Sequence, residues 1–376
     1  MLSDDFRNQA RKAAEEAAQQ VDLEAGGLAV VAQVLKIFAA HDLLTFGFSN
    51  PAATGPQAGD MRKACTIMNE LARYPGGLST IYSVSGILTA LCVSYNGSPE
   101  QKAEILPKVA AGKLQLAFAL TEPGAGSDAA GITTRASVRG NDTYIIEGEK
   151  IYTTGAMSAD IVLVVAKTSP TNPKAFGVVM VPKGAENMTI EPLAKMAGNN
   201  MPSCKITLAG VAVPAANILG GAAGLENAWQ SLRHTGSLER LAVAASACGM
   251  ARAATDRATE FIRERRAFGK VLREFQSIQH LVVEMATLTK GMELFAENAM
   301  QAQEGEEDPT QAISMAKYFC SEQLQRVVEI AVRVLGGRAY FDFEPVSHLY
   351  RQAPLSLFAG GTVEVQKNLI ARTLSI

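Results

Sequence analysis

The sequence has little that suits a metal site, a disulfide framework or a nucleic-acid surface. Lys and Arg number 35 against 37 Asp and Glu, and no basic run stands out, so there is no electrostatic case for nucleic acid. No two cysteines form a Cys-x-x-Cys pair, which excludes the usual zinc motif and a dense disulfide framework. We expect buried free thiols in a reducing compartment at Cys65, Cys92, Cys204, Cys248 and Cys320.

Export and membrane signals are not expected either. Residues 1–7 are charged and have no apolar h-region, as a secretory signal would need. We expect charges to interrupt the apolar stretches before they reach the roughly 20 residues of a membrane span. With 48% hydrophobic and 19% charged residues, the chain has ordinary globular composition. These features predict a cytoplasmic protein without membrane insertion.

The first zone of the chain, residues 1–113, has a helical pattern. Its interruptions look like turns, at 24–27, 49–51 and 74–77. One helix start is well specified, because Ser98 can act as N-cap, Pro99 suits the first helical position and Gln101 completes a capping box. This zone is expected to form an N-terminal helical domain.

The second zone, residues 114–221, carries short apolar runs bounded by Gly, Pro, Asn and Asp. They do not alternate with helical segments, which argues against the parallel dinucleotide-binding sheet. Such runs predict the strands of a compact β barrel or sandwich. They lie at 115–120, 144–146, 161–166 and 177–181.

The third zone, residues 222–376, is helical again. An acidic loop at 304–307 precedes Asp308 and Pro309, which mark a helix start. Long amphipathic segments of this kind form a four-helix bundle, and the fold class is therefore α+β with several domains. The expected helices are 238–263, 276–302, 310–335 and 345–373.

A glycine-rich loop, residues 121–128, follows the strand-like run 115–120. Pro123, Gly124 and Gly126 favour a compact loop whose backbone N–H groups converge on an electron-rich ligand. The hydroxyls of Thr121 and Ser127 would add donors. A tight turn without a ligand is equally compatible with these residues.

Four segments together resemble the acyl-CoA dehydrogenase family, and they stand in the family's order. The first is similar to its flavin-contacting motif, the second to the strand that covers the flavin, and the others to signatures of the helical bundle. They are 119–128, 148–155, 264–276 and 335–337. The resemblance implies a flavoprotein with a helical domain, a β domain and a helical bundle.

The resemblance also implies which residues hold FAD. Those expected around the isoalloxazine ring, with Thr121 and Thr154 as hydrogen-bonding partners, are Phe118, Leu120, Thr121, Ser127, Tyr152 and Thr154. Those expected to hold the rest of FAD, partly across a subunit boundary, are Arg265, Phe268, Gln276, Gly336, Gly337, Thr362 and Glu364. Without the family motif, Arg265 and Arg266 would read as a solvated helix end.

Three positions depart from the family pattern. Tyr152 stands where Trp is usual, and Arg333 stands where Gln is common. Gly360 occupies the place of the Glu that removes the substrate's α proton in many members. A glycine has no side chain to accept a proton, so an active chain needs another base.

Glu239 is the candidate base. The family reaction removes a proton from the α carbon of an acyl-CoA thioester while hydride leaves the β carbon for flavin N5. Leu238-Glu239-Arg240-Leu241 resembles isovaleryl-type members, which carry the base on a bundle helix. Read alone, Glu239 would be an exposed first-turn residue favoured by the helix dipole. The fallback base is Glu364.

Substrate contacts follow from the same resemblance. The N–H of Gly360 would bind the thioester oxygen, and Ser127, Arg240 and Gly361 would contact acyl-CoA. The resemblance implies a homotetramer, a dimer of dimers, with an electron-transfer flavoprotein as electron acceptor. Three alternatives remain open: a reductase of the crotonobetainyl-CoA type, an acyl-CoA oxidase, and a flavoprotein subunit without activity. No metal site is expected.

Overall fold

The computed structural model describes residues 4–22, 28–46, 60–140, 142–169, 171–172, 174–198 and 200–376. It divides into two compact units, and each is described by itself. The bundle unit is Met1–Ala14, Cys65–Ser79 and Ser237–Ile376, and the sheet unit is Glu15–Ala64 and Thr80–Gly236. The turn expected at 74–77 is present, whereas those expected at 24–27 and 49–51 lie outside the described residues.

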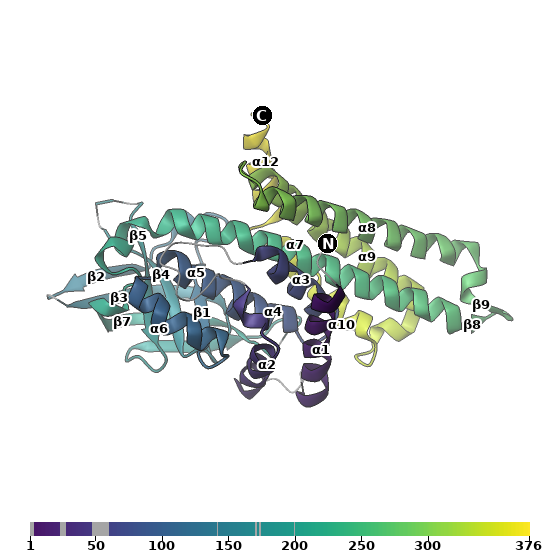
Figure 1. Cartoon of the computed structure of the whole chain (residues 1–376), viewed down its shortest axis with the longest axis horizontal. Helices are drawn as coiled ribbons and strands as arrows, with labels where there is room; N and C mark the ends of the chain where they lie inside the picture. Colours follow the sequence, from purple (N-terminus) through teal and green to yellow (C-terminus); the bar gives the residue numbers. More distant parts are fainter. Residues whose placement is uncertain are drawn as a thin grey trace. The chain divides into compact units, whose positions relative to one another are not determined.

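A mixed sheet of seven strands forms the centre of the sheet unit (Figure 1). The strand order is β1-β4-β2-β3-β7-β6, and β5 pairs with β4 outside this path. The predicted β domain is confirmed, and each strand-like run lies in a strand. The strands are β1 (Leu116–Ala119), β2 (Arg135–Arg139), β3 (Thr143–Thr154), β4 (Ile161–Lys167), β5 (Phe176–Pro182), β6 (Met188–Leu193) and β7 (Ser203–Pro214).

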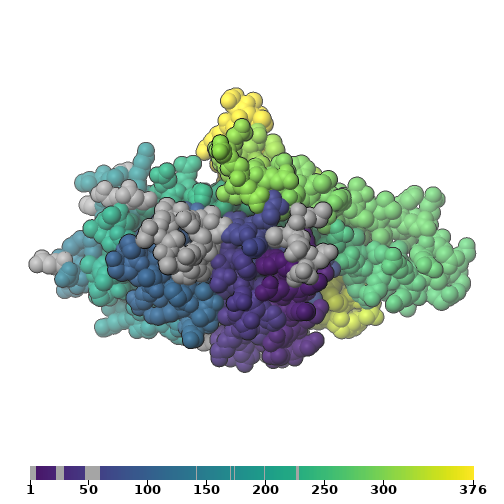
Figure 2. All heavy atoms as spheres, in the orientation of Figure 1, coloured from purple at the N-terminus to yellow at the C-terminus, as the bar shows by residue number. Residues whose placement is uncertain are grey.

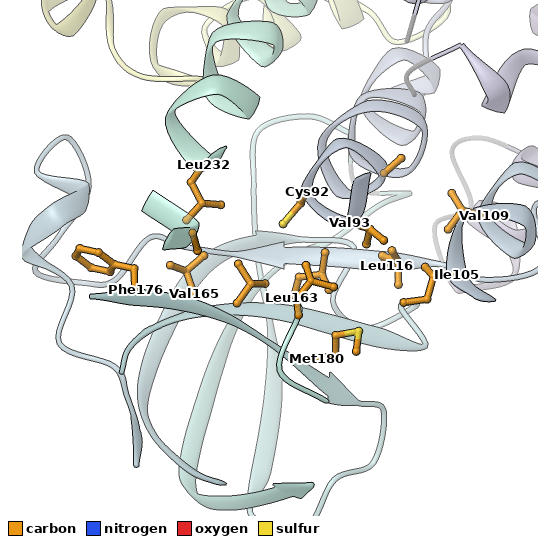
Figure 3. Close-up of a cluster of buried hydrophobic side chains, with 14 of the residues drawn as sticks. Cys92, Val93, Ile105, Val109, Leu116, Leu163, Val165, Phe176, Met180 and Leu232 are labelled. Atoms are coloured by element: carbon orange, nitrogen blue, oxygen red, sulfur yellow. The ribbon is translucent and has the colours of Figure 1, made fainter. Parts of the chain in front are cut away.

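Strand β4 is an uninterrupted apolar run because both of its faces are buried. Leu163 and Val165 point into one hydrophobic cluster, and Val162 and Val164 point into another on the opposite face. This alternation follows from the two-residue period of a strand. In Figure 3 the first cluster lies between the sheet and helices.

Helices α5 (Thr89–Asn96) and α6 (Pro99–Ala110) cover that face of the sheet. Cys92 and Val93 from α5, and Ile105 and Val109 from α6, are labelled in the cluster in Figure 3. The capping box that starts α6 is confirmed. Ser98 Oγ accepts from the Gln101 N–H at 3.2 Å, and the Ser98 N–H donates to Gln101 Oε1 at 2.9 Å.

One apolar stretch corrects the sequence analysis. Residues 78–96 contain no charge and are long and apolar enough to cross a membrane, so the expected interruption by charges is wrong here. The stretch consists of α4 (Leu78–Tyr82), the π-helical η2 (Ser83–Leu88) and α5. Since 78% of it is buried inside the structure, it has the character of a core helix.

The bundle unit contains long helices that run alongside one another (Figure 1). They are α7 (Gly224–Glu264), which begins in the sheet unit, α8 (Gln276–Glu304) and α9 (Thr310–Leu335). The start of α7 lies well before the expected residue 238. The helix expected over 345–373 is three helices: α10 (Pro345–Gln352), α11 (Leu355–Phe358) and α12 (Val363–Thr373).

The break before α12 has a backbone cause. Gly360 and Gly361 have φ of 67° and 95°, in the left-handed region that favours glycine. Pro354 likewise stands between α10 and α11. Helix α9 begins at Thr310, the first residue of the expected helix 310–335, but Pro309 stands just before the helix and not at its first position. The Asp308 carboxylate accepts from the Thr310 N–H at 3.0 Å.

The remaining elements are two helices that continue from one unit into the other along the chain, the helix α2 of the sheet unit, and short helical turns and strands. Helices α1 and α3 run from one unit into the other in sequence. In chain order they are α1 (Asp4–Gln20), α2 (Leu28–Ala40), η1 (Leu43–Thr45), α3 (Met61–Leu71), η3 (Ala129–Gly131), η4 (Ala215–Asn217), η5 (Gly221–Ala223), β8 (Arg266–Ala267), β9 (Lys270–Val271), η6 (Leu272–Glu274) and η7 (Gly336–Tyr340).

A buried carboxylate fixes the end of the bundle unit that carries η7. Glu344 accepts from Arg257 through both carboxylate oxygens, at 2.8 and 2.9 Å, and from Arg338 at 2.6 Å. Charge-assisted bonds of this bidentate kind are strong and directional. All five cysteines are buried and none forms a disulfide bond, as expected.

Candidate functional site

The glycine-rich loop of the sheet unit closes through a tight turn. The N–H of Glu122 donates to the Ala125 carbonyl at 3.1 Å, and the reverse bond measures 3.0 Å. These two N–H groups therefore already donate hydrogen bonds within the loop. Any ligand-binding nest must use the others.

The two glycines of this loop do not act as the sequence suggested. Neither Gly124 nor Gly126 has a positive φ, so the turn does not need glycine for its conformation. A Cβ at either position would meet no atom of the chain within 4 Å. Their missing side chains leave open space above the loop, which suits the close approach of a flat ligand to the backbone.

A buried ion pair between Lys150 and Glu122 fixes the loop to strand β3. Lys150 on β3 donates to Glu122 Oε1 at 2.8 Å and to the Leu120 carbonyl at 3.0 Å, with its side chain fully buried. The Glu122 carboxylate also accepts from the N–H groups of Thr133 and Thr134, at 2.6 and 2.9 Å. The loop is thus anchored at residues 120 and 122 to β3 and to the two residues just before β2.

The pair is ionic at neutral pH. Burial alone would raise the pKa of Glu122, but the bonds from Lys150, Thr133 and Thr134 lower it to about 2. Burial lowers the pKa of Lys150 to about 8, opposed by Glu122, so the ammonium keeps its proton at pH 7. Both residues lie in the segments 119–128 and 148–155, but their pairing was not predicted.

Strand β3 bulges where it passes this loop. The pairing with β7 shifts register between Lys150 and Thr153, and Tyr152 has a φ of 59°, which is rare for an aromatic residue. The N–H of Ile151 donates to the Thr121 carbonyl at 2.9 Å. Tyr152 is 66% exposed. A bulge re-aims a side chain in this way, here next to the loop.

The other predicted ring contacts lie on these same elements. Phe118 and Leu120 are partly buried against the core cluster, and Ser127 is exposed. Thr154, at the end of β3, shares a 3.0 Å hydrogen bond with the Ser203 hydroxyl. The structure brings residues 120–122 and 150–151 together directly. It places Phe118, Ser127, Tyr152 and Thr154 on the strands and loop around them.

In the bundle unit, a second group of predicted residues meets at α7. Arg240 Nε donates to the Gly360 carbonyl at 3.2 Å. A Cβ added to Gly360 would lie 3.4 Å from Arg240 Cγ and 3.6 Å from its Cα. Glu239, next in sequence to Arg240, therefore lies close to the turn 359–362 that carries the two left-handed glycines.

The environment of Glu239 suits a base. Burial raises the pKa of its carboxyl group, and the cations Arg240 and Lys317 oppose the rise. Among the described residues, no group donates a hydrogen bond to this carboxylate. The alternative reading as an exposed first-turn residue is wrong, because α7 begins at Gly224 and Glu239 is partly buried.

The fallback base, Glu364, differs from Glu239 in both exposure and pKa. Glu364 is exposed in the first turn of α12, and hydrogen bonds from its own N–H and from the Thr362 side chain lower its pKa. Thr362 is the N-cap of α12, accepting from the Val365 N–H at 3.2 Å. A carboxylate stabilised in its ionised form is a weaker base.

Lys317 is a residue of this group that the sequence analysis missed. It lies on α9 with a fully buried side chain, and its ammonium donates to the Leu357 carbonyl at 3.0 Å. The available signal was a lysine on the apolar side of a predicted bundle helix, between the buried residues Ile313 and Cys320. A charge there needs partners.

Most residues expected around the rest of FAD are exposed in the single chain, and Thr362 is half-buried. Arg265 and Gln276 flank the β8–β9 hairpin, and Phe268 at its tip is 95% exposed. The chain near residue 270 lies at the surface in Figure 2. Gly336 and Gly337 open η7, where a Cβ would meet no atom within 4 Å. Exposure leaves the solvated-helix-end reading of Arg265 and Arg266 open.

Among the described residues, no group of three or more His, Cys, Asp or Glu side chains is placed to hold a metal ion.

Three family models match the chain and together cover nearly all of it. They are the N-terminal domain of acyl-CoA dehydrogenase over residues 1–113, the middle domain over 117–211, and the C-terminal domain over 204–375. The middle-domain match contains the segments 119–128 and 148–155, and the C-terminal match contains 264–276 and 335–337.

Individual proteins and a solved structure are similar to this chain over nearly its whole length. The chain is 34% identical to a 3-(aryl)acrylate reductase of Clostridium sporogenes, over 88% of this chain and 87% of that one. It is 32% identical to the CarC subunit of the caffeyl-CoA reductase–Etf complex of Acetobacterium woodii, over 88% and 86%. The structure of butyryl-CoA dehydrogenase from Megasphaera elsdenii superimposes with a TM-score of 0.89 at 27% identity, covering 100% and 99% of the two chains.

Proposed function

Because the chain belongs to the acyl-CoA dehydrogenase family, we propose that Glu239 exchanges the α proton of an acyl-CoA thioester in a reaction that uses FAD. As a member, it is an FAD-dependent oxidoreductase that acts on CH–CH bonds. The proposal concerns the residues that do this chemistry, the direction and the substrate.

The residues of the sheet unit fit a flavin. The open space above Gly124 and Gly126 and the exposed face of Tyr152 suit a flat aromatic ring, and Thr121 and Thr154 supply hydroxyls. When bound, FAD exchanges a hydride with the β carbon of the substrate. The exposed Arg265, Phe268, Gln276, Gly336 and Gly337 would hold its pyrophosphate and adenosine, since Arg binds phosphates in a bidentate fork.

The observation that carries the role of Glu239 is its environment. Its carboxyl group is partly buried and has a raised pKa, and the described chain donates no hydrogen bond to it. The ionised form is therefore poorly stabilised, and the carboxylate has a high affinity for a proton, as a base requires. Glu364 is exposed with a lowered pKa, and Gly360 has no side chain. Of these three positions, Glu239 alone has the properties of a base.

The turn beside Glu239 would bind the thioester oxygen. Within the part of the chain that the structure describes, the N–H groups of Gly360 and Gly361 donate to no acceptor. Arg240 fixes the peptide from the other side through the Gly360 carbonyl. Because these two N–H groups have no other acceptor and are held in place, they would stabilise negative charge on that oxygen while the α proton is on Glu239.

The test is anaerobic bleaching of the flavin by acyl-CoA thioesters in the Glu239→Gln variant. We expect it to retain FAD and to bleach about 10²–10⁴-fold more slowly than the unchanged chain, the range for loss of a general base. Glu306→Gln, in the exposed loop before α9, is the matched control and should bleach normally. Normal bleaching by Glu239→Gln would exclude it as the base, and a parallel loss in Glu364→Gln alone would move the role there.

A second candidate is the reverse reaction, reduction of an enoyl-CoA. It is favoured by two relatives named as reductases, the 3-(aryl)acrylate and caffeyl-CoA enzymes. Glu239 would then deliver the α proton rather than remove it. Reoxidation of the reduced flavin by enoyl-CoA, compared with bleaching by the saturated thioester, gives the direction. A chain that holds FAD but responds to neither would be a subunit without activity.

The same relatives suggest the substrate class. Their names refer to aryl-substituted acrylates and caffeyl-CoA, and a base placed on a bundle helix suggests a branched or bulky acyl group. We propose a bulky, branched or aryl-bearing acyl-CoA over a short straight-chain one. A panel of arylpropionyl, isovaleryl and butyryl thioesters, scored by the rate of bleaching, ranks these options.

The assembly and partners are proposed on the same basis. One relative is named as part of a complex with Etf, and a solved structure with 25% identity and a TM-score of 0.88 concerns an electron-transferring flavoprotein of Acidaminococcus fermentans. We propose an electron-transfer flavoprotein as redox partner, a cytoplasmic homotetramer, and domains at 1–113, 114–221 and 222–376. Reduction of that partner by the bleached chain, and the mass in solution, test them.

A further inference from the structure

Three polar side chains on α9 recur every four residues and bind one neighbouring segment. Lys317 donates to the Leu357 carbonyl at 3.0 Å, Ser321 to the Ser356 carbonyl at 2.8 Å, and Gln325 to the Ala353 carbonyl at 3.0 Å. Residues four apart lie on one helix face. We call Lys317, Ser321 and Gln325 the α9 ladder. The Ser356 and Leu357 carbonyls lie in the last turn of the short α11, where carbonyls lack helical partners. The Ala353 carbonyl, just before α11, also accepts from the Ser356 N–H at 3.0 Å.

The segment held by the ladder leads directly into the turn 359–362. On the far side of that turn, Gln366 donates to the carbonyls of Gly361 and Thr362 at 3.1 and 3.2 Å. Arg240 holds the Gly360 carbonyl from α7. The backbone from residue 353 to 362 is therefore held through its carbonyl oxygens by side chains of three helices. Its glycine N–H groups stay free for a ligand.

Lys317 differs from the other two members of the ladder because it is charged. A neutral donor is enough to hold a carbonyl, as Ser321 and Gln325 do, whereas burying an ammonium is costly unless nearby charge compensates. The charged groups around Lys317 come from three elements: Glu239 and Arg240 on α7, Glu322 on α9, and Glu364 on α12. Helix α11 has no ionisable side chain.

Charge on Lys317 has a direct consequence for Glu239. Burial raises the pKa of this carboxyl group, and Lys317 together with Arg240 counteracts that effect. Burial lowers the pKa of Lys317 itself to about 8, with Arg240 adding to the decrease and the three carboxylates opposing it. Lys317 is therefore cationic at neutral pH.

We propose that Lys317 is a positioning residue of the reaction, which holds the segment leading into the turn 359–362 through the Leu357 carbonyl and favours the ionised form of Glu239 through its charge. This rests on the proposed role of Glu239 as the group that exchanges the α proton. Lys317 acts through the turn and the carboxylate, so the two effects can be separated by substitution.

The test is the pH dependence of flavin bleaching by acyl-CoA in three variants. Lys317→Gln keeps a donor but loses the charge, so the midpoint of the acid limb should rise by roughly one pH unit. Lys317→Arg keeps the charge and should keep the midpoint of the unchanged chain. Ser321→Ala keeps the charge but removes one carbonyl bond, so the rate should fall several-fold with no change of midpoint. Lys290→Met, an exposed lysine on α8, is the control for loss of one charge.

An unchanged midpoint in Lys317→Gln would overturn the proposal, even if its rate fell, because a purely structural role lowers rate and stability without moving the midpoint. Should Lys317→Gln not fold, Lys317→Arg decides, since a shifted midpoint in that variant contradicts the role of charge. The proposal on Glu239 is judged separately. If Glu239→Gln is inactive and the midpoint of Lys317→Gln is unmoved, only the role of Lys317 fails.

Discussion

The Lys150 ammonium and the Glu122 carboxylate form a 2.8 Å ion pair in which both side chains are almost completely shielded from water. Removing one partner of such a pair leaves the other charge buried without compensation, which costs more than the intact pair contributes. The pair joins β3 to the loop 121–128, and the loop is the part of the chain proposed to touch the flavin.

Glu122→Gln should therefore destabilise the chain by about 3–5 kcal/mol and reduce its FAD content after purification. Urea unfolding of the apoprotein measures the first effect, and the ratio of flavin to protein absorbance measures the second. Glu149→Gln is the matched control, because Glu149 pairs with Lys205 on a partly exposed face at 2.9 Å. It should cost less than about 1 kcal/mol and leave FAD bound. Equal losses in both variants would contradict the special role of the buried pair.

The same pair makes stability depend on pH in the acid range. The pKa of Glu122 is about 2 in the folded chain, below its ordinary value of 4.5. Its contribution is complete above pH 4.5 and is lost as the pH falls towards 2. The difference in unfolding free energy between the unchanged chain and Glu122→Gln should therefore shrink between about pH 5 and pH 3. A difference that stays constant over this range would show that Glu122 is not ionised in the folded chain.

Local features were predictable from the sequence and long-range pairings were not. The Ser98 capping box was placed correctly because its groups are three residues apart. The start of α7 was placed too late, since Gly224 and Gly236 weaken the helical pattern. The structure overrides that weakness by packing Ala228 and Leu232 into the core cluster.

In the candidate site, too, the sequence located single residues but not the long-range contacts between them. The motifs located Glu239, Arg240 and Gly360, but the bond between Arg240 and the Gly360 carbonyl spans 120 residues. Lys317 was missed because its partner is the backbone carbonyl of Leu357, which carries no sequence signal. The roles of Gly124 and Gly126 were misread, since a glycine that leaves space looks the same in sequence as one that bends the chain.

Gly360→Ala tests the turn beside Glu239. The φ of 67° disfavours any side chain, and the new Cβ would lie 3.4 Å from Arg240 Cγ. We expect a loss of about 1–2 kcal/mol and slower flavin bleaching, because the N–H groups of the turn move. Gly291→Ala is the control. In the middle of α8 its Cβ makes ordinary contacts of 3.5 Å with Phe319, so it should stabilise the chain by about 0.5–1 kcal/mol. Equal stability changes would mean that backbone conformation at residue 360 is unimportant.

The thiols supply a test of the packing in both units. All five cysteines are buried thiols outside any disulfide bond. Burial raises the pKa of Cys92 to about 12 and also raises that of Cys204, while the contact with Cys248 and burial raise that of Cys320. Since the thiolate is the reactive form, the folded chain should react very slowly with a thiol reagent at neutral pH. In denaturing urea, five thiols per chain should react at once.

Ser375→Cys calibrates this measurement, because residue 375 is exposed near the C-terminus. That variant should gain one rapidly reacting thiol in the folded state, which proves that the reagent is active under native conditions. Cys248 and Cys320, whose sulfur atoms lie 3.8 Å apart between α7 and α9, should be protected as a pair and become reactive together. Rapid reaction of either one alone in the folded chain would show that α7 and α9 are not packed against each other as described, and would remove the support that α9 gives to the turn at Gly360.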